Sequence, residues 1–296
     1  MKPIVVIAGL TASGKTKAAI ELAKEWNAEI ISADSVAVYK GLDIGSAKPS
    51  IGEQDNIKHH MIDIVDYKDT YNVARFQEDA RETIKEIQSR DMNVIVVGGT
   101  GLYIKALLYD YRFSKEEQSE YTRDENTEVL YKELESVDPS ALETIHPNNR
   151  KRIIRALESY YNSNKTRDDI TENRKDVEII PAHVFFLQGD RERIYDRINK
   201  RVEIMFDSGL EKEVLNFYEK DPDIFKYPVF QSIGYREFQG YFNTDIDKKT
   251  CISLIQRNTR RFAKRQITWF KHQQKCIWID IFEENVLKTI KKTLEI

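Results

Sequence analysis

Short apolar runs alternate with amphipathic stretches along the chain, and this alternation predicts an α/β fold. Between the early runs, apolar residues recur every three or four positions, as in residues 73–90, which is typical of a helix that covers a sheet. Strands that alternate with helices indicate a parallel sheet flanked by helices. The runs with strand character are residues 4–8, 28–32, 93–97, 182–187 and 276–281.

The segment from about 110 to 178 interrupts this alternation. It is strongly polar and has no convincing strand pattern, but residues 125–136 and 149–162 show helical spacing. We therefore predict a mainly helical insertion between two strands of the sheet. The predicted domains are a catalytic core of residues 1–110 and 179–296 and an insertion of residues 111–178.

Composition narrows the class of protein only slightly. The 296 residues suffice for one large or two smaller domains. With 46 Lys and Arg against 49 Asp and Glu, net charge gives no information about nucleic acid. Two widely spaced cysteines, Cys251 and Cys276, indicate neither a disulfide framework nor a zinc site. No signal-peptide pattern and no apolar run of about 18 residues is present, so we expect a cytoplasmic protein without membrane contact.

The most informative motif is GLTASGKT at residues 9–16, which fits the phosphate-loop pattern G-x-x-x-x-G-K-[ST]. A predicted strand precedes it and a helical pattern follows, as the motif requires. Backbone N–H groups of such a loop converge on a phosphate, Lys15 adds positive charge, and the Thr16 hydroxyl can bind Mg²⁺. A P-loop-type sheet with a diphosphate or triphosphate site is therefore predicted, the alternative being a chance match on a turn.

Polar residues follow two other predicted strands. Because the carboxyl ends of parallel strands share one edge, Asp34 should face the bound phosphate, where a carboxylate could accept a proton or hold Mg²⁺ through water. A helix cap or an Asx turn is the other interpretation. Residues 98–101 read Gly-Gly-Thr-Gly. The glycines permit close backbone approach and Thr100 could contact a phosphate or a base, although tight strand–helix packing explains the glycines equally well.

Basic residues gather in residues 255–271, which contain no acidic residue. A basic face with aromatic residues suits a nucleic-acid backbone, and a solvated helix face is the alternative. A second cluster lies at 149–155. Arg197 and Arg201, one helical turn apart, could clamp a phosphate or form surface ion pairs. His59 and His60 have no third metal ligand nearby in sequence, so a hydrogen-bonding pair is favoured over a metal site.

Together these segments resemble the tRNA dimethylallyltransferase family, also called tRNA isopentenyltransferases. The similar segments span most of the chain in the expected order, whereas residues 113–145 and 164–180 match weakly. The segments are GLTASGKT (9–16), SADSVAVYKGLDIGSAKP (32–49), HHMIDI (59–64), VGGTGLYIKALL (97–108), HPNNRKRIIRALE (146–158), RINKRVEIMFDSGLEKEV (197–214), QSIGYRE (231–237) and TRRFAKRQITWFK (259–271).

The resemblance implies a Mg²⁺-dependent transfer of a dimethylallyl group from dimethylallyl diphosphate to N6 of the adenosine at tRNA position 37, next to the anticodon, with release of diphosphate. By motif it implies Asp34 as general base, with Thr100 and Lys15 as further catalytic residues and Thr16 on the metal. The residues implied to bind diphosphate are Gly9, Thr11, Ala12, Ser13, Gly14, Lys15, Thr16 and Arg201.

The resemblance also implies which residues contact the tRNA anticodon stem-loop, and it gives the helical insertion of residues 111–178 a role in binding tRNA. A monomeric enzyme is expected. One departure bears on this surface: Ala37 stands where many members have Gln, which removes a polar contact to the acceptor. The implied tRNA-binding residues are Asp34, Ser35, Val36, Ala37, Thr100, Arg123, Asn149, Arg150, Lys151, Arg152, Gln231, Gly234, Tyr235, Arg236, Lys264, Arg265, Gln266, Trp269 and Lys271.

Two other functions fit parts of the pattern. A small-molecule kinase would hold ATP in the phosphate loop and use Asp34 to take a proton from a substrate hydroxyl. An RNA-binding protein would use a bound nucleotide only as a conformational switch. The transferase hypothesis accounts for more features, because the poorly nucleophilic amine of adenine needs a base and the basic segments provide an RNA surface.

Overall fold

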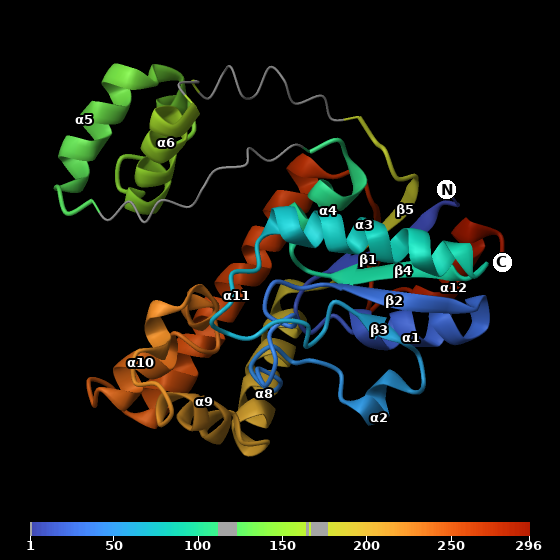
Figure 1. Ribbon diagram of the computed structural model, residues 1–296. Coiled ribbons are helices and arrows are strands. Elements are labelled where there is room, and N and C mark those ends of the chain that lie inside the picture. Colours follow the sequence, from blue (N-terminus) through green and yellow to red (C-terminus); the bar gives the residue numbers. More distant parts are fainter. Residues whose placement is uncertain (1, 112–122, 164–165, 167–176) are drawn as a thin grey trace. The chain divides into compact units, whose positions relative to one another are not determined.

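The computed structural model describes residues 2–111, 123–163, 166 and 177–296. It contains a six-stranded sheet in which all strands are parallel and lie in the order β3-β2-β4-β1-β5-β6 (Figure 1). The predicted α/β fold is confirmed, and five strands lie within one residue of the predicted ends. The strands are β1 (Ile4–Gly9), β2 (Ala28–Ala33), β3 (His59–His60), β4 (Asn93–Gly98), β5 (Ala182–Gln188) and β6 (Ile277–Asp280).

Helices cover both faces of the sheet. On one face, α1 and α12 pack on a core that includes Ile7, Ile30 and Phe185. On the other face lie α3 and α4, and the Phe186 ring packs against Phe270 of α11 at 4.6 Å between ring centroids (Figure 1). Neighbouring residues of β5 thus point to opposite faces, as strand geometry requires. These helices are α1 (Lys15–Trp26), α3 (Val73–Ser89), α4 (Gly101–Leu108), α11 (Lys248–Gln273) and α12 (Val286–Leu294).

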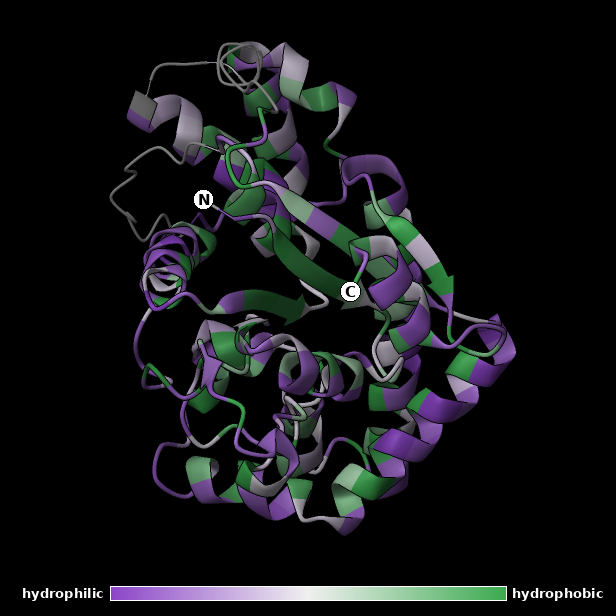
Figure 2. Ribbon diagram, turned by 90° about the vertical axis from the view of Figure 1, so that its right-hand side faces the viewer, coloured by the Kyte–Doolittle hydropathy of each residue, from purple (hydrophilic) through white to green (hydrophobic). Residues whose placement is uncertain are grey.

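The hydropathy of the elements explains this arrangement. Every residue of β1 is buried, and Figure 2 shows hydrophobic strands beneath helices with hydrophilic outer sides. Strands buried on both faces are typical of parallel sheets. In α3, whose predicted range was 73–90, the buried positions Phe76, Ala80, Ile84 and Ile87 recur every three or four residues and form the stripe that faces the sheet.

Further helices follow β5 before α11 returns to the sheet. Phenylalanine and tyrosine rings fill the space between them, as in the stacked pair Phe206 and Phe238 at 5.7 Å between centroids. Aromatic side chains bury large apolar areas, which suits short helices that have little surface of their own. These helices are α8 (Arg191–Asp207), α9 (Leu210–Tyr218) and α10 (Glu237–Phe242), and a short α2 (Ile51–Gln54) precedes β3.

The described residues form two compact units, one of residues 1–108 and 179–296 and the other of residues 109–178. The domain borders predicted from sequence, at 110/111 and 178/179, lie at or within two residues of these borders. The smaller unit contains α5 (Thr127–Val137) and α6 (Arg150–Ser163), where two helices were predicted. Leu130, Leu134, Ile153 and Leu157 are buried between them, so this unit has a hydrophobic core of its own.

Among the described residues, no helix is long and apolar enough to cross a membrane.

Candidate active site

The loop that joins β1 to α1 has the backbone of a phosphate-binding loop. A side chain at Gly9 would place its Cβ 2.6 Å from the Leu187 carbonyl oxygen of β5, so only glycine fits there. Ala12 and Gly14 have φ values of 63° and 84°, and α1 begins at Lys15 without a side-chain cap. Left-handed residues in such a loop turn successive N–H groups toward one concavity, and the uncapped helix start adds further donors.

Lys15 and Arg201 bring two positive charges to this loop. The Lys15 Nζ donates a hydrogen bond to the Leu10 carbonyl oxygen at 2.8 Å. Burial and the neighbouring Arg201 lower the pKa of Lys15 to about 7, and Asp34 partly opposes this effect. Burial also lowers the pKa of Arg201, against the influence of Asp34 and Glu53. Two half-buried cations without enough anionic compensation form a site that a bound diphosphate would stabilise.

Asp34 follows β2 and lines the same cavity. Its Oδ1 accepts hydrogen bonds from the N–H groups of Val36 at 2.8 Å and Ala37 at 3.3 Å, so the predicted Asx turn is confirmed. Within the described residues the second carboxylate oxygen makes no hydrogen bond. The turn therefore fixes the orientation of the carboxylate and leaves one oxygen available to accept a proton from a ligand.

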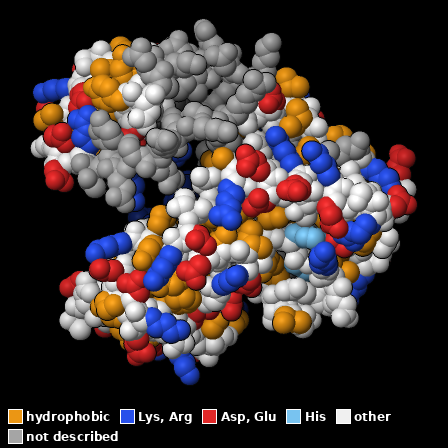
Figure 3. Space-filling model, in the orientation of Figure 1, with side chains coloured by type: hydrophobic (Ala, Val, Ile, Leu, Met, Phe, Trp, Pro, Cys, Tyr) orange, Lys and Arg blue, Asp and Glu red, His pale blue; other side chains and the backbone are white. Residues whose placement is uncertain are grey.

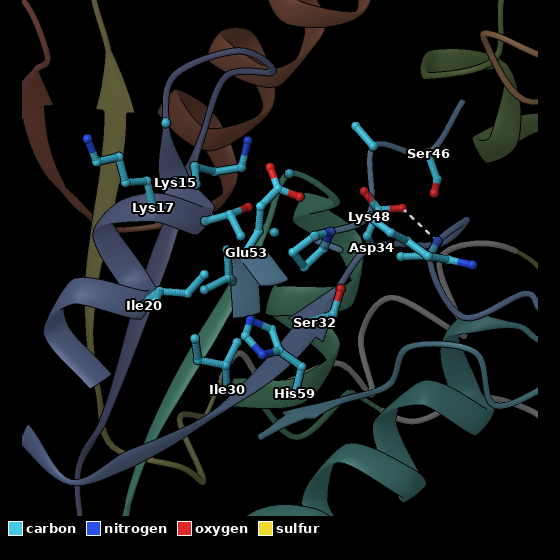
Figure 4. A pocket seen from close by; sticks show the side chains of 18 of the residues that line it. Lys15, Lys17, Ile20, Ile30, Ser32, Asp34, Ser46, Lys48, Glu53 and His59 are labelled. Atoms are coloured by element: carbon cyan, nitrogen blue, oxygen red, sulfur yellow. Dashed lines mark hydrogen bonds between the residues drawn. The ribbon is translucent and has the colours of Figure 1, made fainter. Parts of the chain in front are cut away.

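A cavity of about 600 Å³ extends from the phosphate loop along the carboxyl ends of the strands (Figure 4). Thr16 and Thr100 line it together with the charged residues described above. Its wall is mixed, because apolar side chains stand beside the polar ones, and such a cavity suits a ligand with an anionic head and a hydrocarbon tail. The apolar lining residues include Ile20, Ile30, Ala37, Ile62, Val97 and Phe262.

The glycines around Thr100 are required by packing. A Cβ at Gly98 would lie 2.2 Å from the Ala33 carbonyl oxygen, one at Gly99 would lie 2.2 Å from the Gln266 Nε2, and one at Gly101 would lie 2.2 Å from the Trp269 ring. The strand–helix packing interpretation is therefore confirmed for these glycines. Thr100 itself lines the cavity, so its hydroxyl remains the candidate for a ligand contact.

Gln266 connects α11 to the phosphate loop. Its Oε1 accepts a hydrogen bond from the Thr11 N–H at 3.2 Å, and its Nε2 donates to the Gly99 carbonyl oxygen at 3.0 Å. The side chain is buried. The resemblance implied a tRNA contact for Gln266, and in the structure both ends of its amide bind the protein. Gln266 thereby fixes the phosphate loop relative to the end of β4.

The other face of α11 presents positive charge. Arg257, Arg261, Lys264, Arg265 and Lys271 are exposed, and none of them forms a salt bridge within the described residues. Partial desolvation and the positive charges of Arg236 and Arg261 lower the pKa of Arg265, so these three arginines repel one another. By contrast, basic and acidic side chains are interspersed around α9 and α10 (Figure 3). Clustered cations without acidic partners favour an anionic ligand such as an RNA backbone.

Residues 231–236 include Arg236, which lies near Arg265 of α11, but not all of these residues are exposed. Gly234 and Tyr235 are buried, whereas Gln231 and Arg236 reach the surface. The Gln231 Nε2 donates to the Phe225 carbonyl oxygen, and Arg236 pairs with Glu237 at 3.0 Å. The side chain of Tyr235 is therefore turned into the protein.

Arg197 does not join Arg201 at the cavity. Its guanidinium lies over the Phe282 ring, 4.8 Å from the centroid, and only Arg201 of the two lines the cavity. The two-arginine clamp is therefore not formed.

In the smaller unit, two of the basic residues implied to bind tRNA make internal contacts. Arg123 forms salt bridges with Glu133 at 2.7 Å and Glu125 at 3.2 Å. Arg150 donates to main-chain oxygens of Arg123 and Glu125. Asn149 accepts a hydrogen bond from the Arg152 N–H at 3.3 Å, near the start of α6. The side chains of Lys151 and Arg152 are exposed to solvent.

Sequence reasoning missed the segment that follows β2 as part of the cavity. Ser46, Lys48 and Glu53 line it, and Lys48 forms salt bridges with Asp43 at 2.8 Å and Asp63 at 2.5 Å. The only signal in the sequence for this role was the similarity of residues 32–49 to the family, and that similarity does not indicate which of these residues contact a ligand.

The histidine pair is a hydrogen-bonding pair, as the sequence predicted. The His60 Nε2 lies 2.6 Å from the Glu29 Oε2, and the His59 Nδ1 lies 2.8 Å from the Ile57 carbonyl oxygen. Among the described residues, no group of three or more His, Cys, Asp or Glu could hold a metal ion.

The fold and the cavity together define a class: a phosphate-loop α/β enzyme whose anion site adjoins a carboxylate, an apolar wall and a basic helix. The model of the IPP transferase family matches residues 37–273. A tRNA dimethylallyltransferase of Anoxybacillus flavithermus (strain DSM 21510 / WK1) is 42% identical over 289 residues, which cover 96% of this chain and 92% of that protein. The chain belongs to the IPP transferase family.

Other known proteins agree with this assignment. A tRNA dimethylallyltransferase of Bacillus subtilis (strain 168) is 40% identical over 288 residues, covering 95% of this chain and 91% of that protein. The crystal structure of the full-length tRNA isopentenylpyrophosphate transferase from Bacillus halodurans has a TM-score of 0.76 and 35% identity, over 100% of this chain and 95% of that chain. A eukaryotic dimethylallyltransferase acting on tRNA reaches a TM-score of 0.85 at 28% identity, over 98% and 78% of the two chains.

Proposed function

We propose that this enzyme transfers a dimethylallyl group from dimethylallyl diphosphate to N6 of the adenosine at tRNA position 37, on the 3′ side of the anticodon, and releases diphosphate. Its relatives are named tRNA dimethylallyltransferases. The observation that carries the proposal is one cavity that combines the phosphate loop, Asp34 and an apolar wall. A kinase for a small substrate would not need the exposed basic surface of α11.

The donor binds with its diphosphate in the phosphate loop. The loop N–H groups, Lys15 and Arg201 hold the negative charge, and the hydrocarbon tail lies against the apolar wall. When the carbon–oxygen bond breaks, negative charge develops on the departing diphosphate. Donors that are already in place stabilise this charge without reorganisation, which lowers the barrier to reaction.

Asp34 acts on the acceptor. The exocyclic amine of adenine is a poor nucleophile because its lone pair is delocalised into the ring. As the new carbon–nitrogen bond forms, the amine loses one proton, and the free oxygen of Asp34 accepts it. The carbon–oxygen bond to diphosphate breaks in the same reaction, so the products are N6-dimethylallyladenosine in tRNA, diphosphate and one proton.

Mg²⁺ is part of the proposal. The donors at the cavity fit it, because the Thr16 hydroxyl and the Glu53 carboxylate are hard oxygen ligands. Mg²⁺ at phosphate sites is usually held by one or two protein oxygens together with phosphates and waters. When bound, the ion would supply neutralisation of charge on the diphosphate.

The tRNA is bound by its backbone and by its displaced base. The exposed basic residues of α11, with Arg236, would contact phosphates of the anticodon stem-loop. Lys151 and Arg152 of the smaller unit would add further contacts. An adenosine stacked in the loop must leave the stack to reach Asp34, as enzymes that act on bases generally require.

Incubation of the purified protein and unmodified tRNA with labelled donors tests the proposal. With ¹⁴C-labelled dimethylallyl diphosphate and Mg²⁺, we expect label to enter tRNA, whereas γ-³²P-labelled ATP should leave no label on any acceptor. Transfer of phosphate from ATP without prenyl transfer to tRNA would support the kinase hypothesis and refute this one.

A further inference from the structure

Glu213 of α9 binds the backbone of a cavity segment. Its Oε2 accepts hydrogen bonds from the N–H groups of Asp43 at 2.9 Å and Ile44 at 2.7 Å, and its Oε1 accepts one from the N–H of Gly45 at 3.1 Å. Three consecutive N–H groups that converge on one group form an anion-binding turn, and here the bound anion is the Glu213 carboxylate itself. Residues 43–45 are more than 160 positions away in sequence.

A fourth donor completes this site. The Tyr235 hydroxyl donates to the Glu213 Oε1 at 2.9 Å, and the Tyr235 side chain is fully buried. Burial and the nearby Glu213 raise the pKa of Tyr235, which keeps the hydroxyl protonated and able to donate at neutral pH. Each carboxylate oxygen thus accepts two hydrogen bonds, which fills the main acceptor positions of the group.

The turn that Glu213 binds leads directly into the cavity wall. The Ala47 N–H donates to the Ile44 carbonyl oxygen at 3.0 Å and the Lys48 N–H donates to the Asp43 carbonyl oxygen at 3.0 Å, so residues 43–48 form one compact unit. A Cβ at Gly45 would lie 2.5 Å from the Tyr235 ring, which makes the fit of turn and ring close. Ser46, Ala47, Lys48 and Pro49 then line the cavity beside Asp34 (Figure 4).

We propose that Glu213 is a positioning residue, which holds the 43–48 turn as a wall of the donor cavity and, through Tyr235, links that wall to the 231–236 segment. This inference rests on the proposed function, in which the cavity takes the prenyl donor and the 231–236 segment lies at the tRNA surface. Binding of tRNA at Arg236 and its neighbours then stabilises the donor cavity, because both segments share one half-buried carboxylate.

The same helix offers a matched control. Glu211 accepts hydrogen bonds from the Tyr241 hydroxyl at 2.7 Å and from Lys248 at 2.6 Å, and it does not line the cavity. Glu211 and Glu213 thus lie two residues apart and each accept a hydrogen bond from a tyrosine hydroxyl, but only Glu213 binds the backbone of the turn. A carboxylate that only stabilised the helices would give the same result at both positions.

The test compares Glu213→Gln with Glu211→Gln. A glutamine at 213 keeps the shape but turns an NH₂ donor toward N–H donors, so at least one hydrogen bond is replaced by repulsion. We expect amide exchange at residues 43–45 to rise about tenfold or more, and kcat/KM for dimethylallyl diphosphate to fall about 10- to 100-fold, mainly through KM. For Glu211→Gln we expect exchange and donor KM within about twofold of the wild type. Unchanged exchange at 43–45 in Glu213→Gln, or equal kinetic losses in both variants, would overturn the proposal.

Tyr235→Phe and Tyr241→Phe test the link to tRNA. Each variant removes the hydrogen bond that one tyrosine hydroxyl donates to one glutamate. Only Tyr235→Phe breaks the link between the 231–236 segment and the 43–48 turn. We expect bound tRNA to slow exchange at 43–45 in the wild type and in Tyr241→Phe but not in Tyr235→Phe; the same slowing in Tyr235→Phe contradicts the link. If the wild type transfers no prenyl group to tRNA, the proposed function fails, while exchange measured without substrates still decides whether Glu213 holds the turn.

Discussion

Asp34 can combine two tasks in one side chain, the Asx turn and, in the proposed reaction, the general base. One carboxylate oxygen accepts hydrogen bonds from the N–H groups of Val36 and Ala37, and the other makes no hydrogen bond within the described residues. The sequence left an Asx turn and a general base as alternative interpretations of Asp34. The structure makes them compatible, because a carboxylate has two oxygens. Sequence spacing placed Asp34 at the correct edge of the sheet, whereas the division of its oxygens depends on backbone angles that spacing does not determine.

Asparagine at position 34 separates these two tasks. Its side-chain oxygen can still accept from the two N–H groups, but the amide cannot take a proton. We expect Asp34→Asn to lower kcat by about 10²-fold or more, with the dissociation constants for tRNA and inorganic diphosphate nearly unchanged. Single-turnover kinetics and equilibrium binding provide the measurement. A loss of binding as large as the loss of rate would show that the carboxylate serves binding instead.

The lowered pKa of Lys15 predicts that the protein takes up a proton when an anionic ligand binds. The Lys15 pKa of about 7 in the free protein leaves the side chain about nine-tenths neutral at pH 8, and a bound diphosphate favours the charged form. Calorimetry of inorganic diphosphate binding at pH 8, in two buffers with different ionisation enthalpies, measures the protons taken up.

We expect the wild type to take up close to one proton more than Lys15→Arg, whose guanidinium is charged throughout. Because this proton must be acquired, the affinity of the wild type should fall more steeply between pH 7 and 9 than that of the variant. Equal proton uptake in both proteins would mean that Lys15 is already charged in the free site.

At the scale of elements, the sheet was the most predictable part. Its long strands are continuous apolar runs because both faces are buried, and α3 shows its buried stripe directly in the sequence. β3 was missed because it has only two residues, both histidine. The anchoring of the 43–48 turn by Glu213 could not be predicted either, since a carboxylate that binds backbone N–H groups needs no particular residue type in its partner.

The edge of the sheet contains an acid-sensitive contact. Glu29 of β2 is buried and accepts hydrogen bonds from Arg90, after the end of α3, at 2.7 and 2.8 Å, and His60 of β3 lies 2.6 Å away. Hydrogen bonds from Arg90 and His60 outweigh burial and lower the pKa of Glu29 to about 2. A carboxyl group whose pKa is lower in the folded state adds stability above the pKa of the unfolded chain, near 4.3, and this contribution is lost as the pH falls toward 2.

We therefore expect the free energy of unfolding of the wild type to decrease between about pH 5 and 2 more steeply than that of Glu29→Gln. At pH 7 the variant should be less stable by about 1–2 kcal/mol, a value reduced because Arg90 is partly exposed. Urea unfolding at several pH values measures both effects. Glu86→Gln removes an exposed partner of the same arginine and should change the pH profile little; identical profiles for Glu29→Gln and the wild type would contradict the assignment.

At the scale of the whole molecule, the charge distribution distinguishes this enzyme from a small-molecule kinase. A net charge of −3 conceals the exposed basic residues between Arg257 and Lys271 of α11, which form no salt bridge among the residues that the structure describes. The clustering of basic residues within 255–271 could be predicted from the sequence, because this segment lacks acidic residues. The proximity of Arg236 to Arg261 and Arg265 could not be predicted, since it depends on the packing of α10 against α11.

The basic surface predicts a salt-dependent affinity for tRNA. Arg261→Ala and Arg265→Ala should each weaken binding and reduce the slope of log K against log salt by about 0.7–0.9 for each phosphate that the variant no longer neutralises. Lys291→Ala, on α12 and paired with Glu25, is the control and should leave the slope unchanged. Filter binding from low to moderate salt gives the slopes. Slopes that do not differ among the three variants and the wild type would remove α11 from the RNA surface.

In the proposed reaction, the site beside the phosphate loop directs a prenyl group to one adenine of tRNA. Mass mapping of tRNA fragments, after incubation with the enzyme, dimethylallyl diphosphate and Mg²⁺, identifies the nucleoside that is modified. We predict one dimethylallyl group on the adenosine at position 37, and none in a tRNA with guanosine there. Modification at another nucleoside, or no modification of a tRNA that the enzyme binds, would contradict the account.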